Sequence, residues 1–221
     1  MRGGMWFGLG LLLLLGCSPR IAEPNLAQQA EADLQARQFK PLSGPLSTLV
    51  EDANYVGVPT QVHPLLGQEA PDFQLHDSED RPRQLSEFVR KGPVVLVFYY
   101  GYTCNHCVSQ LFGLSKDIEK FRELGAEIVA ISPDETRLTR ERYERYGAFA
   151  FPVLSDPDNR VAEQYGAYHR AKDEPTHGTF VIGSDGKIVW AYRGDEPFTN
   201  NRTLLVELYR VEKMLGRLKK E

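Results

Sequence analysis

The chain has 221 residues, of which 42% are hydrophobic and 25% are charged, and its formal net charge is −4. This balance is typical of a soluble globular protein with one domain of ordinary size and a tail. It argues against nucleic acid as the main partner, because phosphate binding needs clustered Lys and Arg and the sequence contains no basic block. The three cysteines, Cys17, Cys104 and Cys107, are too few for a disulfide scaffold, so they indicate two separate roles.

The N-terminus has the pattern of a secretory signal peptide. Arg2 is a short positive region, and the apolar run from Met5 to Leu15 is shorter than the roughly 20 residues that span a bilayer. The run ends in Leu14-Leu15-Gly16-Cys17, which resembles the lipobox of bacterial lipoproteins. The resemblance implies that residues 1–16 are removed and that Cys17 is lipidated. We therefore expect a lipid anchor in the bacterial cell envelope, with the protein facing the periplasm or the cell exterior, where disulfides persist.

The next stretch, residues 17–65, is predicted to be a lipidated tether and an N-terminal extension without a reactive site. Its clearest pattern lies over residues 25–39, where Leu26, Ala30 and Leu34 have the spacing of a weakly apolar helix face. We place the main domain at residues 66–221.

The main domain alternates between strand and helix patterns. The predicted strands cover residues 70–75, 94–100, 127–132, 151–154, 179–182 and 187–192. The predicted helices cover residues 85–88, 104–124, 137–146, 160–165 and 203–218. Crossover helices make strands parallel, whereas the hairpin predicted around Asp185-Gly186 adds antiparallel strands. The pattern therefore predicts an α/β, thioredoxin-like fold with a mixed central β-sheet flanked by helices.

The reactive site is predicted at Cys104 and Cys107. This CxxC pair follows the apolar run of residues 94–100 and precedes a helix pattern. A helix N-terminus stabilises a thiolate, so Cys104 is expected to be the attacking thiol. Cys107 lies one turn further along and is expected to be the more buried, resolving thiol. We expect the two to form a reversible disulfide.

His106 lies between the two cysteines and is a candidate redox-tuning residue. A protonated imidazole there would favour the Cys104 thiolate and make the disulfide more oxidising; the alternative is an exposed residue with no such role. Structural zinc would need two further ligands, and the histidines outside the motif show no ligand-like spacing. We therefore expect neither a metal ion nor another cofactor.

Five segments together resemble the AhpC/TSA peroxiredoxin family of the thioredoxin superfamily, over about Gly67 to Arg193. They are Ala70–Phe73, Val95–Phe98, Gly125–Ser132, Phe151–Pro157 and Val161–Gly166. The resemblance implies a thioredoxin-like fold and an antioxidant activity in which cysteines reduce a peroxide. It also implies that a thiol reductant or a thioredoxin-like donor protein returns the electrons.

The segment around the cysteines departs from the typical family pattern. On the family alignment Cys107 takes the peroxidatic position, Cys104 stands where Thr is usual, and Tyr100 stands where Pro is usual. Thr103 is a further candidate pocket residue. Arg160 is the residue that could serve as the family's catalytic Arg; its alternative is an ordinary surface position on a helix.

His177 stands where thioredoxins proper carry a cis-proline, three residues before Phe180. Peroxiredoxins often have a basic residue at this point, so the resemblance predicts that His177 lies near the two sulfurs. The alternative is a histidine in a surface loop.

We therefore expect an extracytoplasmic thiol oxidoreductase with a peroxide or a disulfide as its substrate. A peroxiredoxin-like activity has the wider sequence match, and thioredoxin-like disulfide exchange on envelope proteins has the better match at the active site. A third candidate follows from Gly101-Tyr102-Thr103-Cys104, which also resembles the Sco copper-chaperone family, whose members bind copper through two Cys and a distant His. In that family the cysteines are one residue further apart, and the His would align near Pro175 rather than at His177.

Overall fold

The computed structural model describes residues 25–102, 104 and 106–218. The helices are α1 (Leu26–Ala36), α2 (Leu46–Val50), α3 (Leu85–Val89), α4 (Ser109–Lys116), α5 (Ile118–Glu123), α6 (Thr136–Tyr146), α7 (Arg160–Gln164) and α8 (Asn201–Met214), with a 3₁₀ turn η1 (Arg170–Lys172). The strands are β1 (Gln74–His76), β2 (Pro82–Gln84), β3 (Val94–Phe98), β4 (Glu127–Ser132), β5 (Val153–Ser155), β6 (Tyr168–His169), β7 (Glu174–Pro175), β8 (His177–Ile182) and β9 (Ile188–Gly194).

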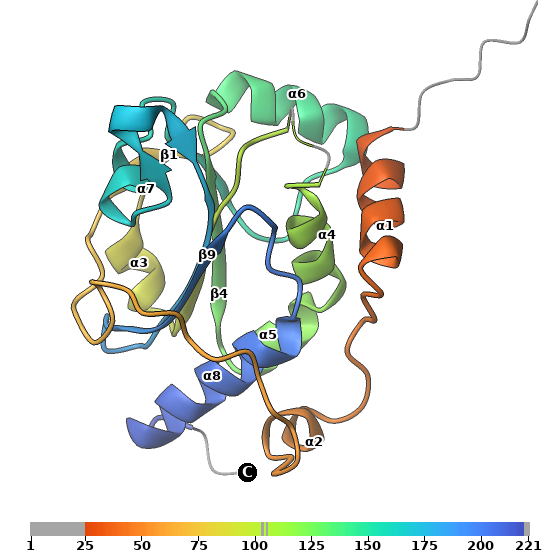
Figure 1. Cartoon of the computed structure of the whole chain (residues 1–221), viewed down its shortest axis with the longest axis vertical. Coiled ribbons are helices and arrows are strands. Elements are labelled where there is room, and N and C mark those ends of the chain that lie inside the picture. Colours follow the sequence, from red (N-terminus) through yellow and green to blue (C-terminus); the bar gives the residue numbers. More distant parts are fainter. Residues whose placement is uncertain (1–24, 103, 105, 219–221) are drawn as a thin grey trace, which may run out of the picture.

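A mixed seven-stranded sheet of order β2-β1-β5-β4-β3-β8-β9 forms the centre of the fold. Strands β3, β4 and β5 are parallel, and β8 and β9 add antiparallel strands beside β3. Helices cover both faces: α3 and α7 lie on one side of the sheet, and α4 and α1 lie on the other (Figure 1). The predicted α/β, thioredoxin-like fold is confirmed.

Strand β3 shows how the sequence produces two cores. All its residues are buried, and successive side chains of a strand point to opposite faces of the sheet. Val95 and Val97 join the cluster beneath α4 and α8, whereas Val94, Leu96 and Phe98 join the cluster beneath α3 and α7. Each such side chain contributes about 1.5–3 kcal/mol when fully buried, so β3 holds both layers together.

The helix predicted over residues 104–124 was wrong in its start and in its continuity. Helix α4 begins only at Ser109, and Asp117 separates it from α5. The buried Asp117 carboxylate accepts hydrogen bonds from the backbone N–H of Leu42 and the side chain of Asn201, and so ties the break to two other segments. These are long-range partners, which helical periodicity cannot reveal.

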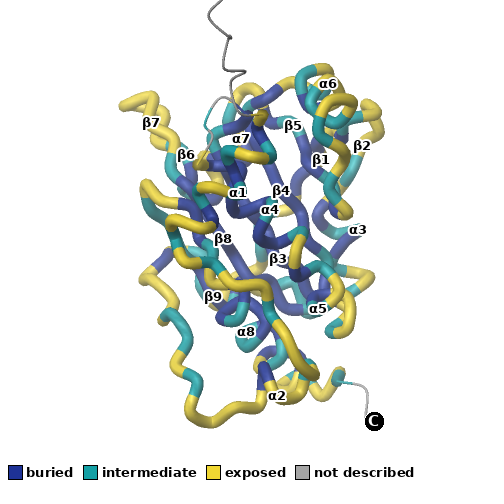
Figure 2. The backbone as a smooth tube through the Cα atoms, turned by 90° about the vertical axis from the view of Figure 1, so that its right-hand side faces the viewer, coloured by how far each residue is buried: buried dark blue, intermediate teal, exposed yellow. Residues whose placement is uncertain are grey.

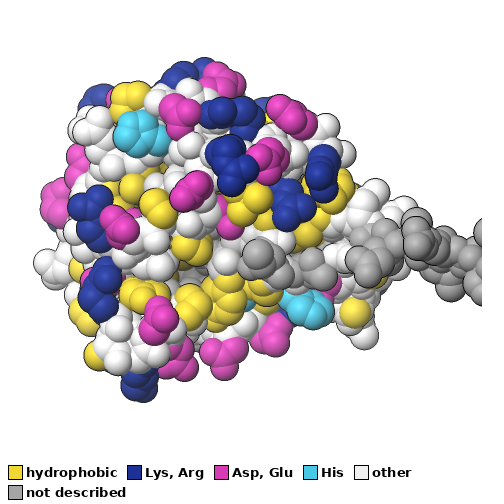
Figure 3. All heavy atoms as spheres, turned by 90° about the horizontal axis from the view of Figure 1, so that it is seen from above, with side chains coloured by type: hydrophobic (Ala, Val, Ile, Leu, Met, Phe, Trp, Pro, Cys, Tyr) yellow, Lys and Arg dark blue, Asp and Glu magenta, His cyan; other side chains and the backbone are white. Residues whose placement is uncertain are grey.

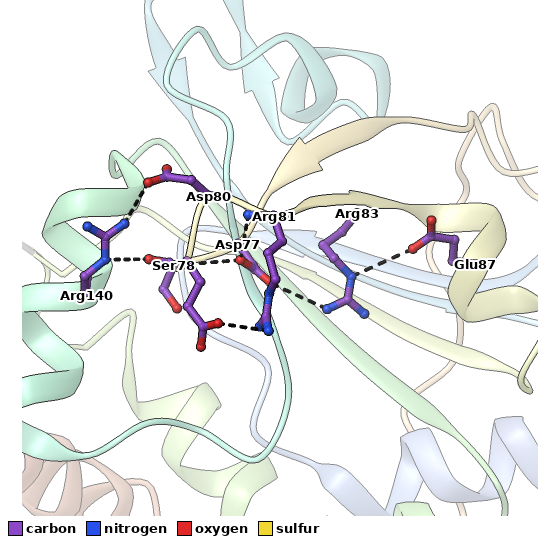
Figure 4. Close-up of polar contacts among 8 residues, drawn as sticks. Asp77, Ser78, Asp80, Arg81, Arg83, Glu87 and Arg140 are labelled. Atoms are coloured by element: carbon purple, nitrogen blue, oxygen red, sulfur yellow. Dashed lines mark hydrogen bonds and ion pairs between the residues drawn. The ribbon is translucent and has the colours of Figure 1, made fainter.

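The first predicted strand, residues 70–75, is a strand only from Gln74 onward. It continues to His76 as β1 and forms a hairpin with β2. Its turn is organised by the buried Asp77, whose carboxylate accepts the backbone N–H of Arg81 and pairs with that residue's guanidinium at 2.9 Å. Arg140 of α6 reaches the same turn and donates to Asp80 and to the Ser78 carbonyl, both at 2.8 Å (Figure 4). The turn thereby fastens the sheet edge to α6.

The N-terminal extension packs on the main domain through α1. The predicted helix face is confirmed, because Leu26, Ala30 and Leu34 are all buried, with Leu34 only 1% exposed. Leu34 and Phe39 lie against Gly113 of α4, where a Cβ atom would come within 3.3 Å of the Phe39 ring. The extension is therefore part of the folded unit, although its boundary with the main domain stays a prediction.

The outer surface carries a further feature. Strands β6 and β7 form a small ribbon apart from the main sheet, and β7 lies at an exposed edge of the molecule (Figure 2).

Over the described part of the chain, no helix combines the length and apolar character needed to cross a membrane.

Candidate redox site

Cys104 and Cys107 are joined by a disulfide between the end of β3 and the start of α4. The backbone passes through two tight turns there, because the Cys104 N–H donates to the Gly101 carbonyl and the Cys107 N–H donates to the Cys104 carbonyl. Cys107 is fully buried at 0% exposure, whereas Cys104 is partly exposed. Of these two residues, Cys104 is therefore the one that a second protein can reach.

Gly101 shapes the approach to the pair. Its φ angle is +92°, and a Cβ atom would lie 2.6 Å from a carboxylate oxygen of Asp134. The same carboxylate accepts the backbone N–H of Tyr102 at 2.8 Å and lies 3.3 Å from the Ser132 hydroxyl. Burial raises the pKa of Asp134, and the hydrogen bonds from Tyr102 and Ser132 only partly oppose this. A buried carboxyl group thus abuts the loop that leads to Cys104.

Three tyrosine hydroxyls are buried in the same region. Those of Tyr99, Tyr102 and Tyr143 have no hydrogen-bond partner among the described residues. Burial raises the pKa of Tyr99 well above its ordinary value, and the neighbouring Tyr102 and Asp134 raise it further. This phenol therefore stays neutral. Sequence analysis did not single out these hydroxyls, although the run from Tyr99 to Tyr102 was a visible signal.

His177 begins β8 and lies in the interior, 2% exposed. Its ring stacks on Tyr100 with 4.3 Å between ring centroids, and its Nδ1–H donates to the Asp195 carbonyl at 3.0 Å. Nε2 is then the unprotonated nitrogen, and it has no partner among the described residues. Burial lowers the pKa of His177, so the ring is held neutral. The surface-loop alternative was wrong, whereas a role beside the sulfurs stays a prediction.

His106 is 71% exposed, and its Nδ1 lies 2.5 Å from the Asp33 carboxylate of α1. Asp33 also accepts from Arg37 at 2.7 Å, and Arg37 in turn pairs with Glu196 at 2.5 Å. Burial alone would raise the pKa of Asp33, but hydrogen bonds from Arg37, Ser109 and His106 outweigh it and lower that pKa. Sequence analysis missed Asp33, because the extension was expected to hold no site.

The remaining predicted residues are Arg160, Thr103 and Cys17. The Arg160 side chain is 76% exposed and pairs with Asp158 at 3.7 Å, which favours the surface alternative. Thr103 and Cys17 lie outside the described residues. No group of three potential metal ligands occurs within the described ranges.

The end of the molecule at which α6 lies is chemically mixed. Figure 3 views this end and shows hydrophobic side chains gathered near its middle, with Lys, Arg, Asp and Glu side chains around them. Neither sign of charge dominates this face, so it offers a partner both apolar and polar contacts.

The sequence matches the AhpC/TSA family over residues 66–191. Thiol-disulfide oxidoreductase ResA from Bacillus thuringiensis subsp. konkukian is 28% identical over 131 residues, which cover 59% of this chain and 71% of that protein. Peroxiredoxin Q, chloroplastic, from Oryza sativa subsp. japonica is 33% identical over 128 residues, which cover 57% of this chain and 58% of the relative.

Solved structures of peroxiredoxins share the fold. Peroxidoxin BcpB from Mycobacterium tuberculosis superimposes with a TM-score of 0.61 and 29% identity, covering 67% of this chain and 99% of that one. The reduced 2-Cys peroxiredoxin of Plasmodium vivax superimposes with a TM-score of 0.59 at 18% identity, covering 70% of this chain and 86% of that one, which is likeness of fold alone. The family match spans more than half of the chain and includes the cysteine pair, so this thiol-dependent oxidoreductase belongs to the AhpC/TSA family.

Proposed function

We propose that the protein exchanges disulfides with other proteins of the cell envelope, and that Cys104 is the attacking thiol. The observation that carries this proposal is the unequal exposure of the two cysteines. A folded protein substrate must bring its own sulfur into contact with the attacking one, and Cys107 is fully buried while Cys104 is partly exposed. The sequence favoured peroxide reduction by breadth of match, whereas the geometry favours exchange.

The reaction proceeds in two balanced steps. In the reduced protein the Cys104 thiolate attacks one sulfur of a substrate disulfide, the substrate S–S bond breaks, and the departing thiolate takes up a proton. Cys107 then loses its proton and attacks the Cys104 sulfur of the mixed disulfide. The second substrate thiol leaves with a proton, and the Cys104–Cys107 disulfide seen in the structure is restored. A thiol reductant or thioredoxin-like donor protein returns two electrons to start the next cycle.

Peroxide reduction is the second candidate, supported by the relationship to peroxiredoxin Q and to peroxidoxin BcpB. On that mechanism the Cys107 thiolate attacks the peroxide, the O–O bond breaks, and water or an alcohol leaves while Cys107 becomes a sulfenic acid. The Cys104 thiol then displaces water and forms the disulfide. A small peroxide needs less room than a protein, but the loop would still have to open around the buried Cys107.

Two single variants distinguish these reactions. Under the proposal, Cys107→Ser accumulates mixed disulfides with partner proteins through Cys104, whereas Cys104→Ser accumulates none. Under the alternative, Cys104→Ser treated with one equivalent of peroxide forms sulfenic acid on Cys107 far faster than free cysteine does. The proposal is refuted if Cys107→Ser traps no partner while Cys104→Ser gives the rapid sulfenic acid.

We also propose that the protein is anchored by lipid at Cys17 and faces an extracytoplasmic space. The support is the Leu14-Leu15-Gly16-Cys17 sequence after an apolar run. A disulfide-forming pair such as Cys104 and Cys107 suits that compartment, because cytosolic reductants keep most thiols reduced. Incorporation of labelled fatty acid and membrane fractionation test the anchor directly.

A further inference from the structure

The N-terminal extension contributes charged groups that meet the CxxC loop. Asp33 lies on α1, Arg37 caps the C-terminus of that helix one turn further along, and their side chains are only 9% and 23% exposed. Asp33 is bound to His106 of the CxxC loop, and Arg37 is bound to Glu196 of the β9–α8 connection. One helix turn of the extension thus connects the reactive loop with a third segment.

The protonation of the Asp33–His106 pair can be derived from the contacts. The lowered pKa of Asp33 means that its side chain is a carboxylate, and a carboxylate can only accept hydrogen bonds. The Nδ1 of His106 must therefore carry the hydrogen that Asp33 accepts. This leaves Nε2 as the nitrogen that can bind or release a proton, on a side chain that is 71% exposed.

Because α4 starts late, the Cys104 thiolate needs another source of stabilisation, and Nε2 of His106 can provide it. A helix dipole acts mainly within the first turn, and α4 begins only at Ser109, so it stabilises the Cys104 thiolate less than a helix beginning at Cys104 would. His106 is the basic side chain nearest to Cys104 in the sequence and belongs to the same loop. It is therefore the candidate for exchanging a proton with that thiol.

We propose that Asp33 is a positioning residue that holds His106 as the proton relay of Cys104, so that the N-terminal extension completes the redox site. The relay rests on the exchange reaction proposed above. Nε2 of His106 takes the proton from the Cys104 thiol, the thiolate attacks the substrate disulfide, and the same proton passes to the departing substrate thiolate. Nδ1 keeps its hydrogen bond to Asp33 throughout, as in other nucleophile–base pairs with an orienting third group.

Other groups face His106 and must be held constant in a test. They are Arg37 at the C-cap of α1, Ser109 at the start of α4 and Glu196 after β9. Asp33 affects the formation of the Cys104 thiolate in two ways that have opposite signs: directly through its negative charge, and indirectly through His106. Loss of a nearby negative charge makes a thiolate easier to form, whereas loss of the orienting group weakens the relay and makes it harder to form.

The test measures alkylation of Cys104 against pH in the full-length reduced protein, with Cys107→Ser as the common background. We expect Asp33→Asn to slow alkylation near pH 6 about threefold, the size typical of one partly exposed charge pair. The matched control is Glu31→Gln, which breaks the 2.9 Å ion pair between α1 and Lys116 of α4 without touching the CxxC loop, and which should leave the profile unchanged.

His106→Asn distinguishes a relay from simple docking of α1. With His106 replaced, Asp33→Asn should no longer slow alkylation, because only the direct effect of the lost charge remains. Unchanged or faster alkylation in Asp33→Asn overturns the proposal, and so does an equal loss in the His106→Asn background, which would show that α1 acts by packing. A wild-type Cys104 no more reactive than free cysteine would refute the exchange function itself; a reactive Cys104 whose profile ignores Asp33 refutes only the role of Asp33.

Discussion

A methyl group placed on Gly101 would test the contact between the reactive loop and the Asp134 carboxyl. Gly101 has a φ angle of +92°, in a region that costs a residue with a Cβ atom about 1–2 kcal/mol. The new Cβ atom would also lie 2.6 Å from the buried carboxylate, which accepts the Tyr102 N–H and has little room to move. Gly101→Ala should therefore lower the free energy of unfolding by about 2–5 kcal/mol, because overpacking adds to the backbone strain.

Gly44 offers a matched control for the backbone strain that a residue with a Cβ atom suffers at a positive φ angle. Gly44 has a φ angle of +91°, and a Cβ atom there would have no neighbour within 4 Å. Gly44→Ala thus carries the strain of the left-handed conformation without the clash, and the difference between the two variants measures the clash alone. Asp134→Ala in the Gly101→Ala background should recover part of the lost stability, since it removes the obstructing carboxylate.

Urea denaturation of the oxidised protein, followed by circular dichroism, compares the wild type with these three variants on one scale. The same series in the reduced protein tells whether the loop still depends on Gly101 when the disulfide is open. Equal unfolding free energies for Gly101→Ala and Gly44→Ala would refute the reasoning, because they would mean that Asp134 does not limit the space at this turn.

Three other outcomes follow from the structure. Leu34→Ala should cost about 2–5 kcal/mol in urea denaturation, because Leu34 is 1% exposed against α4 and leaves a cavity there; a loss below about 0.5 kcal/mol would mean that α1 does not fold with the domain. Burial raises the folded-state pKa of Asp134, so its charge opposes folding at neutral pH; this penalty shrinks as pH falls through the raised pKa and is gone below the ordinary pKa of the unfolded chain. Asp134→Asn should accordingly be more stable than the wild type at pH 7 and lose that advantage in acid, and a constant difference across pH would contradict this. Cys17→Ser should take up no labelled fatty acid; labelling equal to that of the wild type would exclude Cys17 as the acceptor.

Local sequence patterns predicted most of the fold, because the sheet and its helices follow simple periodicities. The apolar run at β3, the Asp185-Gly186 hairpin and the apolar face of α1 all have their expected structure. The pattern failed where distant residues decide the outcome. Asp117 interrupts the predicted long helix because Leu42 and Asn201 bind its carboxylate, and no spacing within the helix could indicate such partners.

In the candidate site, too, the sequence predicted the residues whose chemistry is local and missed those that reach the site from distant segments. The CxxC pair and His106 could be found from the sequence, since their chemistry depends on neighbours within a few positions. Asp33 and Asp134 could not, because each reaches the loop from a different part of the chain. A carboxylate on a helix surface or after a strand looks like an ordinary solvated charge until the tertiary contacts are known. Residues that orient a reactive group are therefore harder to predict than the reactive group itself.

The unequal exposure of the two cysteines has a cause in helix geometry. Cys107, Leu111 and Leu114 are spaced by four and three positions, and all are 0% exposed in one core cluster. Cys107 thus continues the apolar stripe of α4 beyond its N-terminus, whereas Cys104 packs against the same cluster but stays partly exposed. A substrate that must meet Cys107 first has to displace part of that core, whereas one that meets Cys104 does not. The burial of Cys107 follows from the periodicity that folds α4 against the sheet, and the order of attack proposed for disulfide exchange follows from that burial.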